Sequence, residues 1–219
     1  MQYEERLNLS DHIAEQIRDM ITSGTLPGNS RINEVHLAEQ LGVSRTPLRE
    51  ALATLVSEGA LENRPRKGNF VTPLTRTEFA ELYGIRPILD VEALRLSGLP
   101  SSSDLDRLVD LNEKLNAATS TQTRIARDDE WHLLLIKNCG NSVLLDLIRQ
   151  FILRTRRYEI AYLQSAENSQ TAYQEHKVIM DALRAGDLNA ACAGLKQNLT
   201  TGMEPVLNWL ADLENQDGR

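Results

Sequence analysis

The sequence has little cysteine and no apolar run long enough to cross a bilayer. Its two cysteines, Cys139 and Cys192, form no CxxC pair, so we expect reduced packing residues and no disulfide. The missing apolar run excludes a transmembrane helix. The opening MQYEERLNLSDHIAEQ holds acids and amides where a signal peptide needs an apolar stretch. These absences predict a cytoplasmic protein without a membrane partner.

An overall excess of positive charge is also missing, because the formal net charge is −7. This balance argues against a chain that nucleic acid coats along its whole length. Phosphate attraction depends more on the local field than on the total charge. Within residues 43–76 the acids are only Glu50, Glu58 and Glu62. The bases of the same segment are Arg45, Arg49, Arg64, Arg66, Lys67 and Arg76.

The first part of the chain shows short helical patterns followed by a hairpin pattern. Apolar spacing predicts helices over 10–24, with Ser10 or Asp11 as cap, over 33–42, with Asn33 as cap and Gly42 as stop, and from Ser44 onward. Next, LENRPRKGNFVTP predicts two short strands around a turn at Arg66, Lys67 and Gly68. Three helices and a hairpin predict a winged helix-turn-helix domain over residues 1–75.

The second part, residues 76–219, shows long helical patterns and no strand pattern. It therefore predicts an all-α helical bundle, and the fold class is mainly α. The expected helices lie near 76–98, 103–118, 121–139, 142–164, 168–185 and 187–213. Asn141 after Gly140 and Asp187 after Gly186 should be points where one helix stops and the next begins.

Two arginines lie one turn apart in GVSRTPLREAL, residues 42–52. Residues four apart share a helix face, and Leu48 and Leu52 occupy the buried face, so Arg45 and Arg49 should point outward. In a helix-turn-helix the start of the second helix enters the major groove, where arginine donates two hydrogen bonds to guanine. The alternative is that both arginines merely solvate the helix.

Other polar residues near these arginines suit phosphates. We expect Ser44 and Thr46 to contact the DNA backbone beside the helix N-terminus. Arg66 and Lys67 of the wing should lie along the backbone or in the minor groove, and Gly68 permits close approach.

Residues 10–72 closely resemble the DNA-binding domain of the GntR family of bacterial transcription regulators. The block LAEQLGVSRTPLREAL carries this resemblance most specifically. The resemblance implies that Arg45, Thr46 and Arg49 contact double-stranded operator DNA and that Gly68 lies at the wing tip.

The bundle contains a candidate metal cluster. DDEWH places Asp128 and His132 on one face of one helix, and His176 lies on a later helix. One carboxylate and two imidazoles that converge can bind a divalent transition metal. The alternative is an ordinary hydrogen bond between Asp128 and His132, with His176 packed in the core.

Residues 76–213 are similar to the FCD ligand-binding domain of the FadR subfamily of GntR regulators. DDEWHLLLIKNCGNSVL and EHKVIMDALRAGDLNAACAGLKQNL carry the similarity. It implies a site for Zn²⁺ or Ni²⁺ built from one Asp and three His. Asp128, His132 and His176 match three of these positions, and Asn198 takes the place of the fourth ligand. A metal-free site, in which the histidines donate to an effector, stays open.

The same similarity implies that Arg86 holds the carboxylate of a small effector. A planar guanidinium suits that task. The alternative is a salt bridge from Arg86 to Asp90, four residues on. Asn198 and Arg154 are further candidates for effector contacts.

Together these patterns predict a ligand-responsive repressor that binds a palindromic operator as a homodimer. Its effector would be a small carboxylate metabolite. Two alternatives belong to other classes of protein. One is a metal-dependent enzyme of small organic acids, although the sequence contains no nucleophile elbow and no phosphate loop. The other is a DNA-binding protein whose bundle serves only dimerisation.

Overall fold

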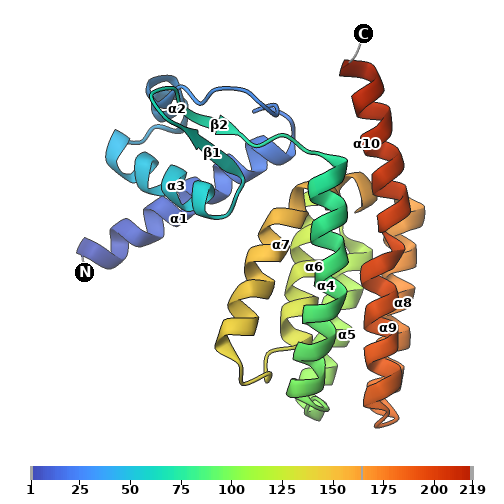
Figure 1. The fold of residues 1–219 in the computed structure, drawn as a ribbon. Coiled ribbons are helices and arrows are strands. Elements are labelled where there is room, and N and C mark those ends of the chain that lie inside the picture. Colours follow the sequence, from blue (N-terminus) through green and yellow to red (C-terminus); the bar gives the residue numbers. More distant parts are fainter. Residues whose placement is uncertain (1, 164, 218–219) are drawn as a thin grey trace. The chain divides into compact units, whose positions relative to one another are not determined.

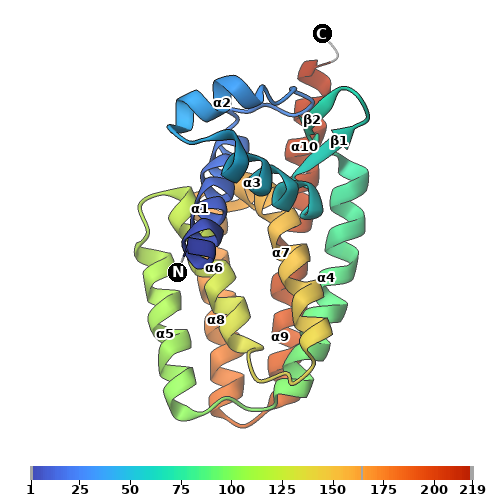
Figure 2. The same ribbon diagram turned by 90° about the vertical axis from the view of Figure 1, so that its left-hand side faces the viewer.

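The computed structural model describes residues 2–163 and 165–217, which divide into two compact units at residues 74 and 75. Figures 1 and 2 show the two units along the chain, a small one with a two-stranded sheet and a larger helical one. The fold is mainly α, as the sequence predicts. Among the described residues, no helix is both long and apolar enough to span a membrane.

The first unit contains three helices and an antiparallel hairpin. Its elements are α1 (Gln2–Thr22), α2 (Glu34–Leu41), α3 (Arg45–Ser57), β1 (Leu61–Arg64) and β2 (Gly68–Val71). The strands pair from Leu61 with Val71 to Arg64 with Gly68, so the loop between them is residues 65–67. Within that loop Arg66 has a φ of 62°, a left-handed conformation that tightens the turn.

Local signals explain the helix ends in this unit. The Asn33 side chain accepts from the backbone N–H groups of Val35 and His36, and Gly42 ends α2 in the left-handed conformation. The expected cap of α1 at Ser10 or Asp11 is wrong, because α1 begins at Gln2 and Ser10 is buried within it. Residues 2–9 contain no Gly or Pro, so nothing in the sequence stops the helix there.

The core of the first unit joins α1 to α3. Ile13 and Ile17 of α1 and Leu48, Leu52 and Leu55 of α3 are all essentially inaccessible to solvent. Burial of this stripe fixes the rotation of α3 about its axis. The opposite face of α3, with its two arginines, therefore points to solvent.

The second unit is an all-helical bundle. Its helices are α4 (Arg76–Ser97), α5 (Ser102–Ala117), α6 (Thr121–Leu135), α7 (Ser142–Leu163), α8 (Ala166–Arg184), α9 (Leu188–Thr201) and α10 (Met203–Asp217). The expected restart points are confirmed, since Asn141 and Asp187 accept from backbone N–H groups at the starts of α7 and α9. The single helix expected over 187–213 is wrong, because α9 and α10 meet at Gly202.

The bundle core surrounds Trp131, which is completely buried with Leu94, Leu108 and Leu195. Helices α8 and α9 run side by side in both views (Figures 1 and 2). Their close approach depends on Gly194, because a Cβ there would lie 3.0 Å from Cγ1 of Ile179. This helix pair carries two of the candidate ligands, His176 and Asn198.

Gly194→Ala therefore should destabilise the bundle, although alanine is the better helix former. The matched control is Gly84→Ala in α4, where an added Cβ meets nothing within 4 Å. Both changes bring the same gain in helix propensity. The difference between the two variants in free energy of unfolding therefore isolates the cost of overpacking at Gly194, which we expect to be roughly 1–3 kcal/mol. Thermal unfolding followed by tryptophan fluorescence reports on the bundle, which holds both tryptophans, Trp131 and Trp209. Equal stability of the two variants would contradict the close-packing argument.

Candidate functional site

The first candidate site is the outward face of α3. Arg45, Thr46 and Arg49 are exposed in its first two turns, as predicted. Ser44 occupies the N-cap position, but its hydroxyl makes no capping hydrogen bond. That hydroxyl and the free N–H groups of the helix N-terminus are therefore available to an anion such as a phosphate.

An open groove runs between the start of α2, α3 and the wing. Its lining residues are Arg31, Ile32, Asn33, Glu34, Val35, Arg45, Arg49 and Gly68. Sequence reasoning missed Arg31, which precedes α2 and forms an isolated bridge with Phe70 of the wing. Its place in the sequence gives no signal of this role, because the bridge joins residues that lie far apart in the chain. Arg66 and Lys67 are exposed at the wing tip.

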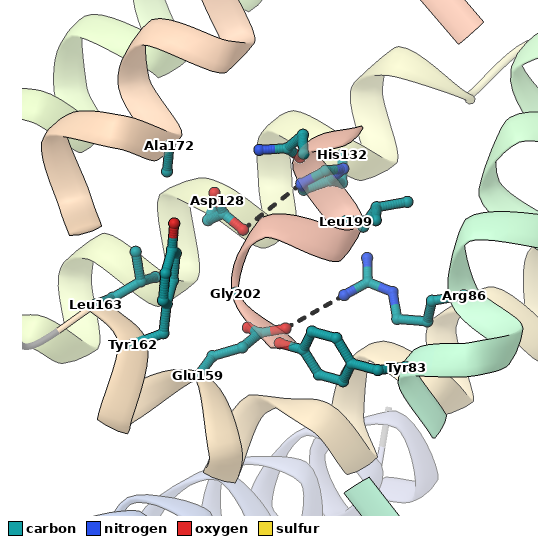
Figure 3. A pocket seen from close by; sticks show the side chains of 11 residues that line it. Tyr83, Arg86, Asp128, His132, Glu159, Tyr162, Leu163, Ala172, Leu199 and Gly202 are labelled. Carbon is teal, nitrogen blue, oxygen red and sulfur yellow. Dashed lines mark hydrogen bonds and ion pairs between the residues drawn. The ribbon is translucent and has the colours of Figure 1, made fainter. Parts of the chain in front are cut away.

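The second candidate site is a small cavity inside the bundle (Figure 3). Five helices and Gly202 contribute to its wall. The lining residues are Tyr83, Arg86, Asp128, His132, Glu159, Tyr162, Leu163, Ala172, Asn198, Leu199 and Gly202. Its free space for water-sized molecules is about 40 Å³. A water needs roughly 10–15 Å³ by this measure, so the cavity holds a few waters or a comparably small group.

The structure brings Asp128, His132 and His176 together. Each offers one ligand atom, and these atoms all lie within 4.8 Å of one another. Nε2 of His132 is 3.6 Å from one carboxylate oxygen of Asp128, and Nε2 of His176 is 3.5 Å from the other. These separations are too long for good hydrogen bonds, and they leave room for an ion between the three side chains.

Hydrogen bonds fix which nitrogen of His176 faces the cluster. The amide nitrogen of Asn112 donates to the Tyr173 carbonyl, so the amide oxygen of Asn112 faces Nδ1 of His176 at 3.0 Å. Nδ1 must therefore carry the proton, and the lone pair lies on Nε2, which has no hydrogen-bond partner. A histidine held this way by an outer partner is the usual arrangement in metal sites.

Burial keeps both imidazoles neutral. Burial lowers the pKa of His176 to about 3. Burial also lowers the pKa of His132 well below its ordinary value, and the neighbouring His176 and Arg86 lower it further. Burial also raises the pKa of Asp128 well above its ordinary range, aided by the charges of Glu159 and Asp129. Two neutral nitrogen ligands beside a half-buried carboxyl group are a donor set that fits Zn²⁺ or Ni²⁺.

Asn198, the predicted fourth ligand, lines the same cavity. Its amide nitrogen donates to Glu175 at 3.0 Å, and the second oxygen of Glu175 accepts from Thr201 at 2.6 Å. Glu175 therefore fixes the Asn198 side chain by its amide nitrogen. The part that Asn198 plays as a ligand stays a prediction.

Arg86 is buried in the cavity wall and pairs with two carboxylates. Its Nη2 donates to Asp90 and its Nη1 to Glu159, each at 3.2 Å. The salt bridge to Asp90 considered from the sequence is thus present, and Glu159 adds a second partner. The third nitrogen, Nε, is buried and has no partner in the part of the chain that the structure describes. Figure 3 shows Arg86 and Glu159 meeting on one side of the cavity and Asp128 and His132 on the other.

Arg154, the third effector candidate, does not line this cavity. It lies on α7, and its Nη2 donates to Glu78 at 2.8 Å. Sequence reasoning missed three polar residues that do line it, Tyr83, Glu159 and Tyr162. The hydroxyl of Tyr162 and one oxygen of Glu159 are buried without hydrogen-bond partners among the described residues. No spacing signal marks them, because they depend on how α7 packs against α4, α6 and α8.

Two family models match the chain. Residues 9–71 match the bacterial regulatory proteins of the gntR family, and residues 81–201 match the FCD domain. Among curated relatives, the uncharacterized HTH-type transcriptional regulator YdhC of Bacillus subtilis is 28% identical over 207 residues. These residues cover 86% of this chain and 92% of that protein. A probable D-xylose utilization operon transcriptional repressor of Paenarthrobacter nicotinovorans is 29% identical over 182 residues, 80% of each chain.

A solved structure shares the fold. McbR/YncC of Escherichia coli superposes with a TM-score of 0.77 over 92% of this chain and 98% of its own, at 24% sequence identity. At that identity the likeness shows the common fold alone.

His132→Ala should lower the affinity for Zn²⁺ or Ni²⁺ by more than about 100-fold. Loss of a residue that only hydrogen-bonds to a metal ligand typically lowers metal affinity by roughly 10–100-fold, and we expect this effect from Asn112→Ala. Loss of a ligand itself should therefore cost more. The measurement is metal titration of chelator-treated protein, with bound metal determined by elemental analysis. His36→Ala, at an exposed position on α2, serves as the control and should bind like the wild type. Unchanged affinity in His132→Ala, or no binding by the wild type, would refute the metal site.

Proposed function

The chain belongs to the GntR family of bacterial regulatory proteins and carries an FCD domain, and we propose that it is a repressor controlled by a small carboxylate. In this proposal a homodimer binds a palindromic operator, and the effector changes operator affinity from the bundle. The observation that carries the proposal is the pairing of two sites in separate units. One is the exposed arginine face of α3, and the other is a buried polar cavity with unpartnered donors and acceptors.

The family and the names of the relatives indicate a transcription regulator and not an enzyme. Repression is proposed because one relative is named as a transcriptional repressor. Arg45 and Arg49 would read bases in the major groove, while Ser44 and Thr46 bind phosphates. Arg66 and Lys67 would follow the backbone or enter the minor groove, and Gly68 would let the wing come close.

A homodimer is supported by apolar side chains exposed on two adjacent helices of the bundle. Ile85 and Ile88 of α4 and Val143 and Leu147 of α7 each expose at least 40% of their surface. Helices α4 and α7 pack against each other, so these residues belong to one pair of helices. Pairing of this apolar surface with a second copy would bury it and would match the two-fold symmetry of a palindromic operator.

The cavity suits a metal and a small acid together. Asp128, His132 and His176 would hold the metal, with Asn198 beside them. A divalent metal held by three protein ligands retains open coordination positions, which oxygen atoms of a carboxylate can fill. Arg86 would add its Nε–H group, and Tyr162 its hydroxyl, since neither has a partner in the cavity. Arg154 would act indirectly, through Glu78.

A bundle that serves only dimerisation is the competing proposal. Against it stand the polar atoms of the cavity wall that lack partners among the described residues, because they offer donors and acceptors that the carboxylate of a small acid can satisfy.

Arg49→Ala should weaken operator binding by about 5- to 150-fold per half-site, the value of one bidentate contact to guanine, ~1–3 kcal/mol. The operator is first selected from a pool of randomised palindromic duplexes with the full-length chain. Affinity is then measured by fluorescence anisotropy at fixed salt. Arg107→Ala, which removes an equally exposed arginine from the bundle, is the matched control and should bind normally. Tight binding by Arg49→Ala would show that α3 does not read the groove.

Small carboxylates should stabilise the metal-loaded protein by about 2.7 kcal/mol at a hundredfold excess over Kd. Tyr162→Phe removes one unpartnered hydroxyl, and it should weaken this binding by roughly tenfold, ~1–1.5 kcal/mol, without harming the fold. Thermal shift across a panel of small acids provides the measurement, followed by operator binding with each acid that stabilises. If no acid stabilises the metal-loaded protein, the purely dimerising bundle is the better description.

A further inference from the structure

An acid lies inside the groove that faces DNA. Glu34 is the first residue of α2, and its carboxylate accepts a hydrogen bond from Nε of Arg49 at 2.8 Å. Both side chains line the open groove together with Arg31, Arg45 and Gly68. In the proposed complex a carboxylate in this groove would repel DNA phosphates and lower the affinity for DNA of any sequence. We therefore expect Glu34 to bring a benefit that offsets this loss of affinity.

Stability does not explain the pair well. The Arg49 side chain is 61% exposed and that of Glu34 is 26% exposed, and ion pairs of this kind contribute little to folding. The acid also lies in the first turn of α2, where it complements the helix dipole. That benefit requires no contact with Arg49, and the Asn33 side chain already caps two N–H groups of this helix.

The geometry of the contact points to a role in recognition. A guanidinium offers two edges that can donate two parallel hydrogen bonds, the end formed by both Nη atoms and the side formed by Nε and one Nη. Glu34 occupies Nε and therefore blocks the side edge. The end edge stays available, and its two nitrogens match O6 and N7 of guanine.

We propose that Glu34 is a positioning residue that makes Arg49 read its base end-on and thereby sets the specificity of the protein at one base pair of each half-site. Glu34 touches no base in this arrangement. The hydrogen bond that it accepts from Nε restricts rotation about the terminal side-chain bonds of Arg49. The guanidinium then samples fewer orientations that do not match guanine. The inference rests on the proposed DNA-binding role of Arg49.

The experiment measures discrimination and not affinity alone. The full-length wild type first selects its operator, and the base pair read by Arg49 is the one at which Arg49→Ala no longer discriminates. Discrimination is then the ratio of affinities for the selected duplex and for duplexes changed at that pair. Glu34→Ala should reduce this ratio by at least about fivefold, part of the value of a bidentate contact. Its affinity for a duplex of unrelated sequence should stay equal or rise, because an acid has left the groove.

Two further variants separate positioning from charge and from folding. Glu39→Ala removes an exposed acid from the same helix and should leave the ratio unchanged. Glu34→Gln keeps an oxygen that accepts from Nε, and it should retain most of the discrimination. Unchanged discrimination in Glu34→Ala, or an equal loss in Glu39→Ala, would overturn this inference alone. A wild type that selects no duplex would overturn both the DNA-binding proposal and the positioning role.

Discussion

The bundle depends on a guanidinium held between two carboxylates in its interior. Arg86, Asp90 and Glu159 each expose less than a tenth of their side chains, and Arg86 bonds to both acids. Burial raises the pKa of Asp90, against the pull of Arg86, because the pocket wall solvates its charge poorly. Each acid keeps one oxygen without a partner. The network is therefore incompletely satisfied by the residues that the structure describes, and it places polar atoms in the wall of a cavity inside a helical core.

Helix α7 connects this network to the start of the bundle. Glu159 contacts Arg86, while its neighbours Arg157 and Tyr158 bind Glu78 in the first turn of α4. The backbone N–H group of Thr75 donates to the Tyr158 hydroxyl at 3.1 Å. Burial would raise the pKa of Glu78, but the bond from Arg154 and the charge of Arg157 outweigh it and lower that pKa. In the proposed function, an effector that moved Glu159 would therefore act on α4, the helix that begins where the first unit ends.

The sequence predicts the elements of both units well where the signal is local. The caps at Asn33 and Asp187 and the left-handed conformation of Gly42 each depend only on residues within one helical turn. The spacing of Asp128 and His132 is a local signal, but the convergence of His176 with them is predicted only through family resemblance, because nothing local relates α6 to α8. Glu159, Asn112 and Arg31 escape prediction for the same physical reason. Their roles arise from packing between elements far apart in the chain, and their residue types are ordinary on any helix or loop.

The proposed metal site joins elements that the network of Arg86 leaves separate. Asp128 and His132 belong to α6, His176 to α8, and Asn112 anchors His176 to α5. Burial and the charges of Glu159 and Asp129 raise the pKa of Asp128 well above its ordinary range. A metal would supply positive charge to this cluster, and three protein ligands would leave positions for an effector, unlike a closed structural site. Stability of the cavity and affinity for the effector would then depend on the same ion, which is the coupling that a ligand-controlled regulator requires.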